Sequence, residues 1–202
     1  MKKYLLLSII VLIGCIYIVN KFNSDKTEYI TQSVPTTDIV NVIETNNDSI
    51  DITEAICLAT NIYHEARGES YAGKVAVANV TMNRVTSPKF PNTICNVVYQ
   101  AQTKENWKGN TVPKRNKCQF SWYCDGKSDD IILVTADGKI IKERMLAWEM
   151  SQLVANQSVR GNLIDITDGS THYFNSELAN PYWAKHLEQV VQIDSHSFLR
   201  IN

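Results

Sequence analysis

Three features that would direct the interpretation early are missing from this chain of 202 residues. No cluster of lysine and arginine is evident, and the formal net charge is −1, so the sequence gives no electrostatic basis for a nucleic-acid partner. No C-x-x-C pair is present, which argues against a structural zinc site. No internal repeat or low-complexity tract occurs either. The hydrophobic content of 44% is that of an ordinary globular protein, so one core is expected.

The N-terminus has the composition of an export signal. Lys2 and Lys3 precede an unbroken apolar stretch over 4–19, slightly shorter than the roughly 20 residues that span a bilayer as a helix. Because no small-x-small cleavage site follows, we expect residues 1–20 to be an uncleaved signal anchor, with the rest of the chain outside the cytoplasmic membrane. Two alternatives remain: lipoprotein processing at Cys15, within "LIGC", and a buried core helix.

Export changes the interpretation of the remaining cysteines. They are even in number, and in an oxidising compartment such cysteines form disulfides. We therefore expect two bridges, with the pairing left open, among Cys57, Cys95, Cys118 and Cys124.

The composition divides the chain after the N-terminal segment. Residues 21–50 are rich in Asn, Ser, Thr and Asp with only scattered apolar residues, which predicts a flexible polar linker. The folded domain is expected over 51–202. It should begin at Asp51, a helix N-cap with Glu54 as its capping-box partner.

Hydrophobic spacing predicts helices in the first part of this domain and strands in the last. A helix starting at 52 should end at Gly68, with an inward face formed by Ile52, Ala55, Ile56, Ala59, Ile62, Tyr63 and Ala66. Further helices are expected over 70–85, from 92 and over 142–157, with loop over 101–139. The segments "THYFN", "QVVQID" and "SFLRI" are typical of strands, the last two joined as a hairpin at 194–196. Helices followed by small strands predict an α+β fold.

The segment "NIYHEARGES" contains the strongest catalytic candidate, Glu65. At 100° per residue Glu65 lies at the border of the helix's apolar face, where partial desolvation raises the pKa of a carboxyl group and suits it to act as a general acid. The alternative is a solvated carboxylate at a helix end. The segment differs from the zinc motif H-E-x-x-H because Gly68 occupies the place of the second histidine, so no metal or cofactor is expected.

Five ordered blocks then indicate a family. They are "IYHEARGES", "GKVAVANVTMNRV", "SPKFPNTICNVVYQ", "QFSWYCDG" and "PYWAKHLEQVVQIDSHSFLRI". Together they resemble the cell-wall hydrolases typified by spore-cortex-lytic enzymes of the SleB type. The resemblance implies a lysozyme-like α+β domain, related to goose-type lysozymes and lytic transglycosylases, that acts on peptidoglycan glycan strands. It also implies that Glu65 is the catalytic acid.

Two mechanisms follow from this resemblance. In a lytic transglycosylase one carboxyl group protonates the glycosidic oxygen and then accepts the proton of the muramyl 6-hydroxyl as an anhydro ring closes. Glu69 could instead be a second carboxylate that orients water, which would give a reducing sugar. We favour the single-acid mechanism.

Substrate contacts are expected from the loop "CQFSWYCDG", which lies in one of the family blocks. Gln119 and Ser121 offer hydrogen bonds and Trp122 a flat face for a sugar ring, although Trp122 could equally be a core residue; Tyr173 is a further candidate. Two other functions remain open: a non-catalytic wall-binding module, and a peptide-cleaving amidase using zinc or a Cys-His pair. The expected partners are peptidoglycan and, through the N-terminal segment, the cytoplasmic membrane.

Overall fold

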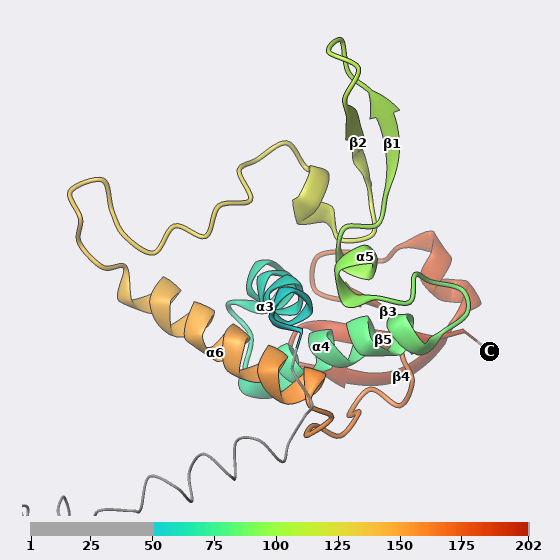
Figure 1. The fold of residues 1–202 in the computed structure, drawn as a ribbon. Helices are drawn as coiled ribbons and strands as arrows, with labels where there is room; N and C mark the ends of the chain where they lie inside the picture. The colour runs from blue at the N-terminus through green and yellow to red at the C-terminus, as the bar shows by residue number, and fades with distance from the viewer. Residues whose placement is uncertain (1–50, 202) are drawn as a thin grey trace, which may run out of the picture. The chain divides into compact units, whose positions relative to one another are not determined.

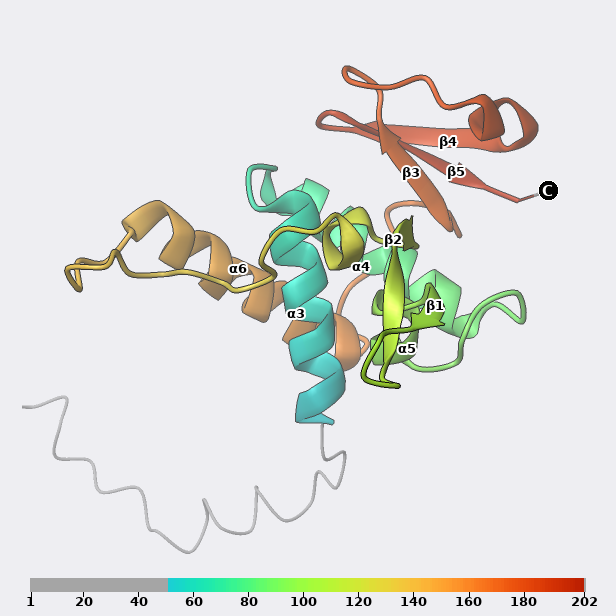
Figure 2. The same ribbon diagram turned by 90° about the horizontal axis from the view of Figure 1, so that it is seen from above.

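The computed structural model describes residues 51–201. Helix α3 (Ile52–Ala66) lies at the centre of the helical part, packed against α6 (Lys142–Val159), α5 (Ile94–Val98) and α4 (Tyr71–Thr86). A three-stranded sheet lies beside the helices, and a separate two-stranded hairpin projects away from them (Figures 1 and 2). The predicted combination of helices with small strands is confirmed.

Helix α3 begins where the sequence predicts. The Asp51 carboxylate accepts hydrogen bonds from the backbone N–H groups of Thr53 and Glu54, at 2.9 and 3.3 Å. The capping-box role of Glu54 is wrong, because its carboxylate instead accepts from the N–H groups of Ile94 and Cys95 at the start of α5. Glu54 thus joins the first helix to a segment forty residues later.

The predicted inward face of α3 is correct only in part. Ile62, Ala59 and Ala66 are buried, but Ile52 and Ile56 are 71% and 52% exposed. The first turns of α3 extend beyond the core, so periodicity there is not matched by burial. The core is completed by Leu58 and by valines of α4 and α5.

Helix α4 is buried on nearly all sides because it lies between two sets of partners. Val77 and Ala78 belong to the main core with α3, whereas Ala76 and Val80 pack against Phe198 of the sheet. Its N-cap is Ser70, whose hydroxyl accepts from the N–H of Gly73 at 3.2 Å. Helix α4 therefore connects the helical core to the sheet.

The expectation of loop over 101–139 is wrong for its first half. Strands β1 (Ala101–Glu105) and β2 (Thr111–Cys118) form an antiparallel hairpin, followed by the 3-10 helix η1 (Ser121–Cys124). Both strands are mostly exposed, so neither has the alternating apolar residues that identify a half-buried strand. Beyond η1 the segment is irregular as predicted, apart from one bridge between Val134 and Ile140.

The C-terminal sheet is antiparallel in the order β3-β5-β4. Its strands are β3 (His172–Asn175), β4 (Glu188–Ile193) and β5 (His196–Arg200), with the 3-10 helix η2 (Tyr182–His186) before β4. The predicted hairpin between the last two strands is confirmed. Its turn contains Asp194, whose φ of 49° is the left-handed conformation that Asp tolerates better than most residues.

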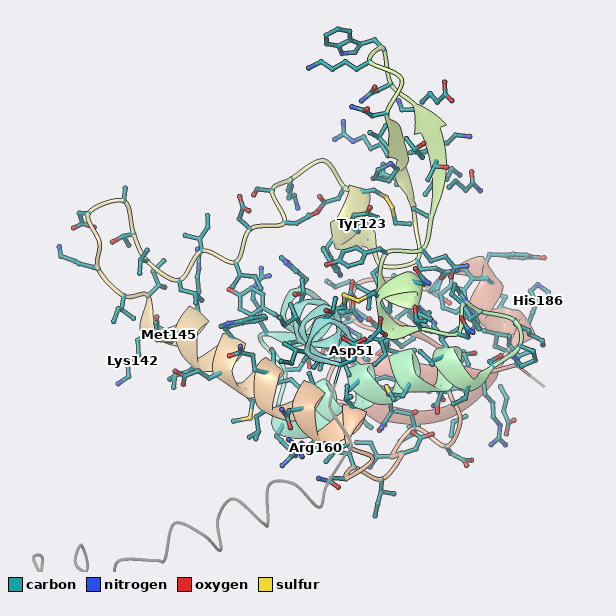
Figure 3. All side chains as sticks on the ribbon, in the orientation of Figure 1. Asp51, Tyr123, Lys142, Met145, Arg160 and His186 are labelled. Carbon is teal, nitrogen blue, oxygen red and sulfur yellow. A yellow bond between two sulfur atoms is a disulfide. The ribbon has the colours of Figure 1, made fainter. Side chains whose placement is uncertain are left out.

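Two disulfides are present, as expected. Cys57–Cys95 joins α3 to α5, and Cys118–Cys124 joins the end of β2 to the end of η1; the yellow bonds in Figure 3 mark them. The signal anchor (1–20) and linker (21–50) predicted from the sequence lie outside the described residues. Within 51–201, no helix combines the length and apolarity needed to cross a membrane.

Candidate active site

Glu65 lies in the last turn of α3 and faces a cleft of about 400 Å³. We call this the Glu65 cleft. Its walls come from the end of α3, from η1 and the loop after it, and from α6. The lining residues are Tyr63, His64, Glu65, Arg67, Ser121, Trp122, Asp125, Lys127, Ser128, Asp129, Asp130, Ile132 and Arg144. The cleft brings together segments that are far apart in the sequence, from Tyr63 to Arg144.

The Glu65 carboxyl is largely removed from water, although it reaches the cleft. This desolvation raises its pKa above the ordinary value, opposed by a hydrogen bond from Tyr173 and by the positive charge of Arg84. The Tyr173 hydroxyl donates to Glu65 Oε2 at 2.9 Å. Burial and the neighbouring carboxyl raise the pKa of Tyr173 well above its usual range, so this phenol remains a donor at any physiological pH.

Arg84 of α4 is a buried cation near this pair, and the sequence interpretation did not identify it. Its side chain is 4% exposed; Nε donates to the carbonyl of Thr171 at 2.8 Å, and the guanidinium lies 4.9 and 5.3 Å from the ring centres of Phe120 and Phe90. Its Nη1 has no hydrogen-bond partner within the described part of the chain. Burying a charge is costly unless it is paired and hydrogen-bonded. The positive charge of Arg84 lowers the pKa of Glu65 and so partly offsets the effect of desolvation on that carboxyl.

The second predicted carboxylate, Glu69, has different partners from Glu65. Its Oε1 accepts from the hydroxyl of Ser195, in the turn between β4 and β5, at 2.9 Å. The same oxygen lies 3.8 Å from Nδ1 of His196, the first residue of β5. Glu69 is not among the residues that line the Glu65 cleft. The structure thus places the two acidic groups in different surroundings.

The turn between α3 and α4 is fixed to the sheet at this point. Asp194 Oδ2 accepts from both the N–H and the hydroxyl of Ser70, at 2.9 and 2.7 Å. Gly73 is required nearby, because a Cβ there would lie 2.4 Å from Asp194 Oδ2 and 2.7 Å from the Glu69 Cβ. This contact between turns holds the end of α3, and therefore Glu65, against the strand that carries Tyr173.

The ring of Trp122 is buried, whereas a flat face for stacking on a sugar ring would be exposed. It is only 8% exposed, its indole N–H donates to Asn61 Oδ1 at 3.0 Å, and the His64 ring is stacked on it at 4.5 Å with an interplanar angle of 17°. Ser121 is exposed on the cleft wall, whereas Gln119 is exposed but does not line the cleft. Of the predicted substrate contacts, Ser121 and Trp122 therefore line the cleft, and Tyr173 bonds Glu65.

These residues give the site a defined chemical capacity. A carboxyl group with a raised pKa can hold a proton near neutrality and donate it to a leaving-group oxygen, while Tyr173 and Arg84 stabilise the carboxylate that results. No cluster of three or more His, Cys, Asp or Glu side chains suited to a metal ion occurs within residues 51–201.

Comparison with known proteins identifies the family of this chain. Residues 68–199 match the family model described as Cell Wall Hydrolase, and Glu65 lies just before the matched segment. Curated relatives include spore cortex-lytic enzymes from Halalkalibacterium halodurans, 29% identical over 70% of this chain and 33% of the relative, and from Bacillus cereus, 27% identical over 71% of this chain and 42% of the relative. The chain thus spans between a third and about two fifths of the length of these relatives.

Solved structures agree. The catalytic domain of Bacillus cereus SleB is 27% identical, covers 76% of this chain and 94% of its own, and superposes with a TM-score of 0.52. The catalytic domain of the germination-specific lytic transglycosylase SleB from Bacillus anthracis is 25% identical, covers 76% of this chain and 98% of its own, and has the same TM-score. The predicted lysozyme-like α+β fold is confirmed by this likeness, and the chain belongs to the Cell Wall Hydrolase family.

Proposed function

We propose that this protein cleaves the glycan strands of peptidoglycan between N-acetylmuramic acid and N-acetylglucosamine, as a lytic transglycosylase with Glu65 as its single general acid and base. The observation that carries the proposal is the hydrogen-bonded, desolvated Glu65 carboxyl at the wall of a cleft. Family membership supports it, and so does the likeness to the Bacillus anthracis relative, which is named a lytic transglycosylase.

The proposed reaction needs one carboxyl group in two successive roles. Protonated Glu65 gives its proton to the glycosidic oxygen as the bond from the muramyl C1 to that oxygen breaks, which releases the neighbouring sugar with a free hydroxyl. The muramyl 6-oxygen then bonds to C1, and its proton passes to the Glu65 carboxylate. The acid is regenerated, no water is consumed, and the product is a 1,6-anhydro sugar.

The residues around Glu65 suit both protonation states that it takes during this cycle. While the proton is absent, the carboxylate is stabilised by the Tyr173 hydroxyl and by the nearby positive charge of Arg84. Desolvation has the opposite effect and favours return of the proton. A carboxyl balanced between these influences can give and take back a proton within one active site.

Hydrolysis by a pair of carboxylates is the competing mechanism. It would require Glu69 to position water at the cleaved bond, yet Glu69 accepts a hydrogen bond from Ser195 and does not line the cleft. The single-acid mechanism is therefore favoured.

We also propose that the N-terminal segment keeps the protein at the outer side of the cytoplasmic membrane, because Lys2 and Lys3 precede the apolar stretch 4–19.

Product analysis tests the proposal directly. Purified peptidoglycan is incubated with the full chain, with its Glu65→Gln variant or with a matched control, and the soluble fragments are identified by mass spectrometry. The control is Glu149→Gln, at an exposed position of α6. We expect anhydromuropeptides from the wild type and the control and none from Glu65→Gln. Reducing-end fragments would support hydrolysis instead, and cut peptide stems or full activity of Glu65→Gln would refute a glycosidase centred on Glu65.

A further inference from the structure

The hairpin formed by β1 and β2, residues 101–118, is the most basic projection of the described chain. We call it the basic hairpin. It carries one acidic residue, Glu105, and five cationic ones: Lys104, Lys108, Lys114, Arg115 and Lys117. These residues are exposed, and in Figure 3 the side chains of the hairpin extend into solvent away from the helices. Lys114, Arg115 and Lys117 are already close in the sequence, and pairing of the two strands adds Lys104 and Lys108 to the same projection.

Three of these cations lie in a β-bulge at the base of the hairpin. Ala101 pairs with Cys118 and Thr103 with Pro113, so the four residues 114–117 oppose the single residue Gln102. Asn116 within the bulge has a φ of 57°, a left-handed conformation. The three cations thus lie within four consecutive residues, in a segment where the regular alternation of side chains is interrupted.

The tip of the hairpin carries an exposed aromatic ring. Trp107 is 90% exposed, more than any other large hydrophobic residue described, and Lys108 Nζ lies 4.8 Å from the centre of its ring. The indole therefore has one face near a cation and a large surface open to a ligand. A flat, exposed indole is suited to stacking on a sugar ring or to resting at a lipid interface.

The base of the hairpin is continuous with the wall of the Glu65 cleft. The Cys118–Cys124 disulfide joins β2 to the end of η1, which supplies Ser121 and Trp122 to that wall. The Arg115 guanidinium lies against Gly126, where a Cβ would be 3.4 Å from Cζ, and Gly126 stands between the cleft residues Asp125 and Lys127. A polymer leaving this side of the cleft would meet the basic bulge next.

We propose that the basic hairpin is a second binding surface for the wall polymer, which takes up the anionic part of a peptidoglycan strand bound in the Glu65 cleft. Carboxylates on the peptide stems would meet the cations of the bulge, and a more distant sugar would stack on Trp107. The inference rests on the proposed function, since it concerns the same substrate. It adds a partner surface outside the cleft and assigns it to the charged stems.

The position of the three bulge cations favours this polymer over a membrane. Trp107 at the tip is about four residues along the strand from the bulge, or roughly 14 Å at about 3.4 Å per residue. A bilayer in contact with Trp107 would therefore lie at least this far from the bulge cations. That exceeds the screening length of about 8 Å at physiological ionic strength, so the bulge cations would contribute little. A polymer extending from the cleft reaches them directly.

Binding to purified peptidoglycan tests the proposal. The full chain carrying Glu65→Gln, which prevents digestion, is compared with the same chain carrying either Lys114→Glu with Lys117→Glu, or Trp107→Ala. A matched control carries two charge reversals outside the hairpin, Lys89→Glu with Lys142→Glu. Co-sedimentation should give roughly tenfold weaker binding for the Lys114/Lys117 variant and a clear loss for Trp107→Ala, with a smaller salt dependence for the former and little change for the control.

Activity measurements with an intact Glu65 separate this inference from the proposed function. The hairpin variants should cleave whole peptidoglycan more slowly. They should cleave a short oligosaccharide that lacks peptide stems and fills only the cleft at the wild-type rate, which also shows that they are folded. If the wild type cleaves peptidoglycan but the hairpin variants bind and cleave it equally well, the hairpin inference is wrong and the proposed function stands. It is also wrong if the variants lose binding only to vesicles of phosphatidylglycerol, because the partner is then a membrane. If the wild type cleaves no glycan, both proposals fall.

Discussion

Tyr173 donates its phenolic hydrogen to Glu65 across 108 residues of sequence, with Oη 2.9 Å from Oε2. The ring is held from the sides, 5.4 Å from the centre of His196 and 5.6 Å from that of Phe198. The sheet thereby fixes a donor against the carboxyl group at the end of a helix. This contact links the two halves of the fold at the site of the proposed chemistry.

Replacing Tyr173 by Phe should change the pH dependence of cleavage as well as its rate. The hydrogen bond favours the ionised form of Glu65 and so opposes the rise of its pKa; without it the pKa rises further. Glu65 then stays protonated to higher pH, and the alkaline limb of the pH–rate profile moves to higher pH. Loss of a hydrogen bond to the charged form should lower the maximal rate by about tenfold or more.

The control for this measurement is Tyr71→Phe, which also removes a tyrosine hydrogen bond, to Gln157, but away from the cleft. It should leave the profile in place. An unchanged alkaline limb in Tyr173→Phe would mean that the hydroxyl does not influence the titration of Glu65.

Removing the ionisable group at 65 should stabilise the protein at neutral and alkaline pH. The folded-state pKa of Glu65 is raised, so the stability that its carboxyl contributes is full below the unfolded-state pKa and is lost as pH rises through the folded-state value. Glu65→Gln escapes this loss. We expect its melting temperature to exceed that of the wild type by roughly 2–4 °C at pH 8, if about 1 kcal/mol is recovered, and the difference to shrink towards pH 4. Thermal unfolding at a series of pH values measures this, and a pH-independent difference would contradict it.

Much of the helical framework could be predicted from the sequence because it depends on local signals. Asp51 caps α3, Ser70 caps α4, and the apolar spacing of the following residues places both helices within a few positions. The last hairpin could be predicted in the same way, since Asp194 and Ser195 separate two β-rich runs. The basic hairpin could not, because its strands pack on no core and carry no apolar alternation.

Within the candidate site, a local pattern singled out only Glu65, whereas the other residues expected there came from the family resemblance. Glu65 was identifiable from its place at the edge of a helical face. Its relation to Tyr173, the buried Arg84 and the separation of Glu69 from the cleft depend on contacts between segments about twenty to more than a hundred residues apart. The same holds for Glu54, which satisfies the start of α5 instead of its own helix.

Trp122→Phe should destabilise the fold more than it weakens substrate binding. The substitution removes the indole N–H that donates to the buried Asn61, leaving an amide oxygen without its donor, and it loosens the stack with His64. A loss of about 1–3 kcal/mol in the free energy of unfolding is expected. Urea denaturation measures it, with Trp183→Phe, at a residue that is 41% exposed, as the control. Unchanged stability together with a raised KM would assign Trp122 to the substrate instead.

The two disulfides should differ in their contribution to stability. In the chain-entropy description, a bridge closing 38 residues stabilises by about 4 kcal/mol and one closing 6 residues by about 2 kcal/mol. Cys57→Ala with Cys95→Ala should therefore lower the free energy of unfolding more than Cys118→Ala with Cys124→Ala. The second pair should instead affect activity, because it fixes the hairpin to the cleft wall. Paired denaturation and cleavage assays test this, and the reverse order of the two effects would be incompatible with it.

Glu69→Gln distinguishes the two mechanisms most directly. If Glu65 acts alone, the amide keeps an oxygen that can accept from Ser195, and we expect anhydro products at a rate within about threefold of the wild type. If Glu69 orients water, the loss of its charge should lower the rate by roughly a hundredfold or more, in the range of a lost general base. The same change also removes the carboxylate beside His196, so a modest loss of stability is expected in either case and must be measured separately by thermal unfolding. A large loss of activity in a fully folded Glu69→Gln protein, with reducing-end products from the wild type, would replace the single-acid mechanism by the two-carboxylate one.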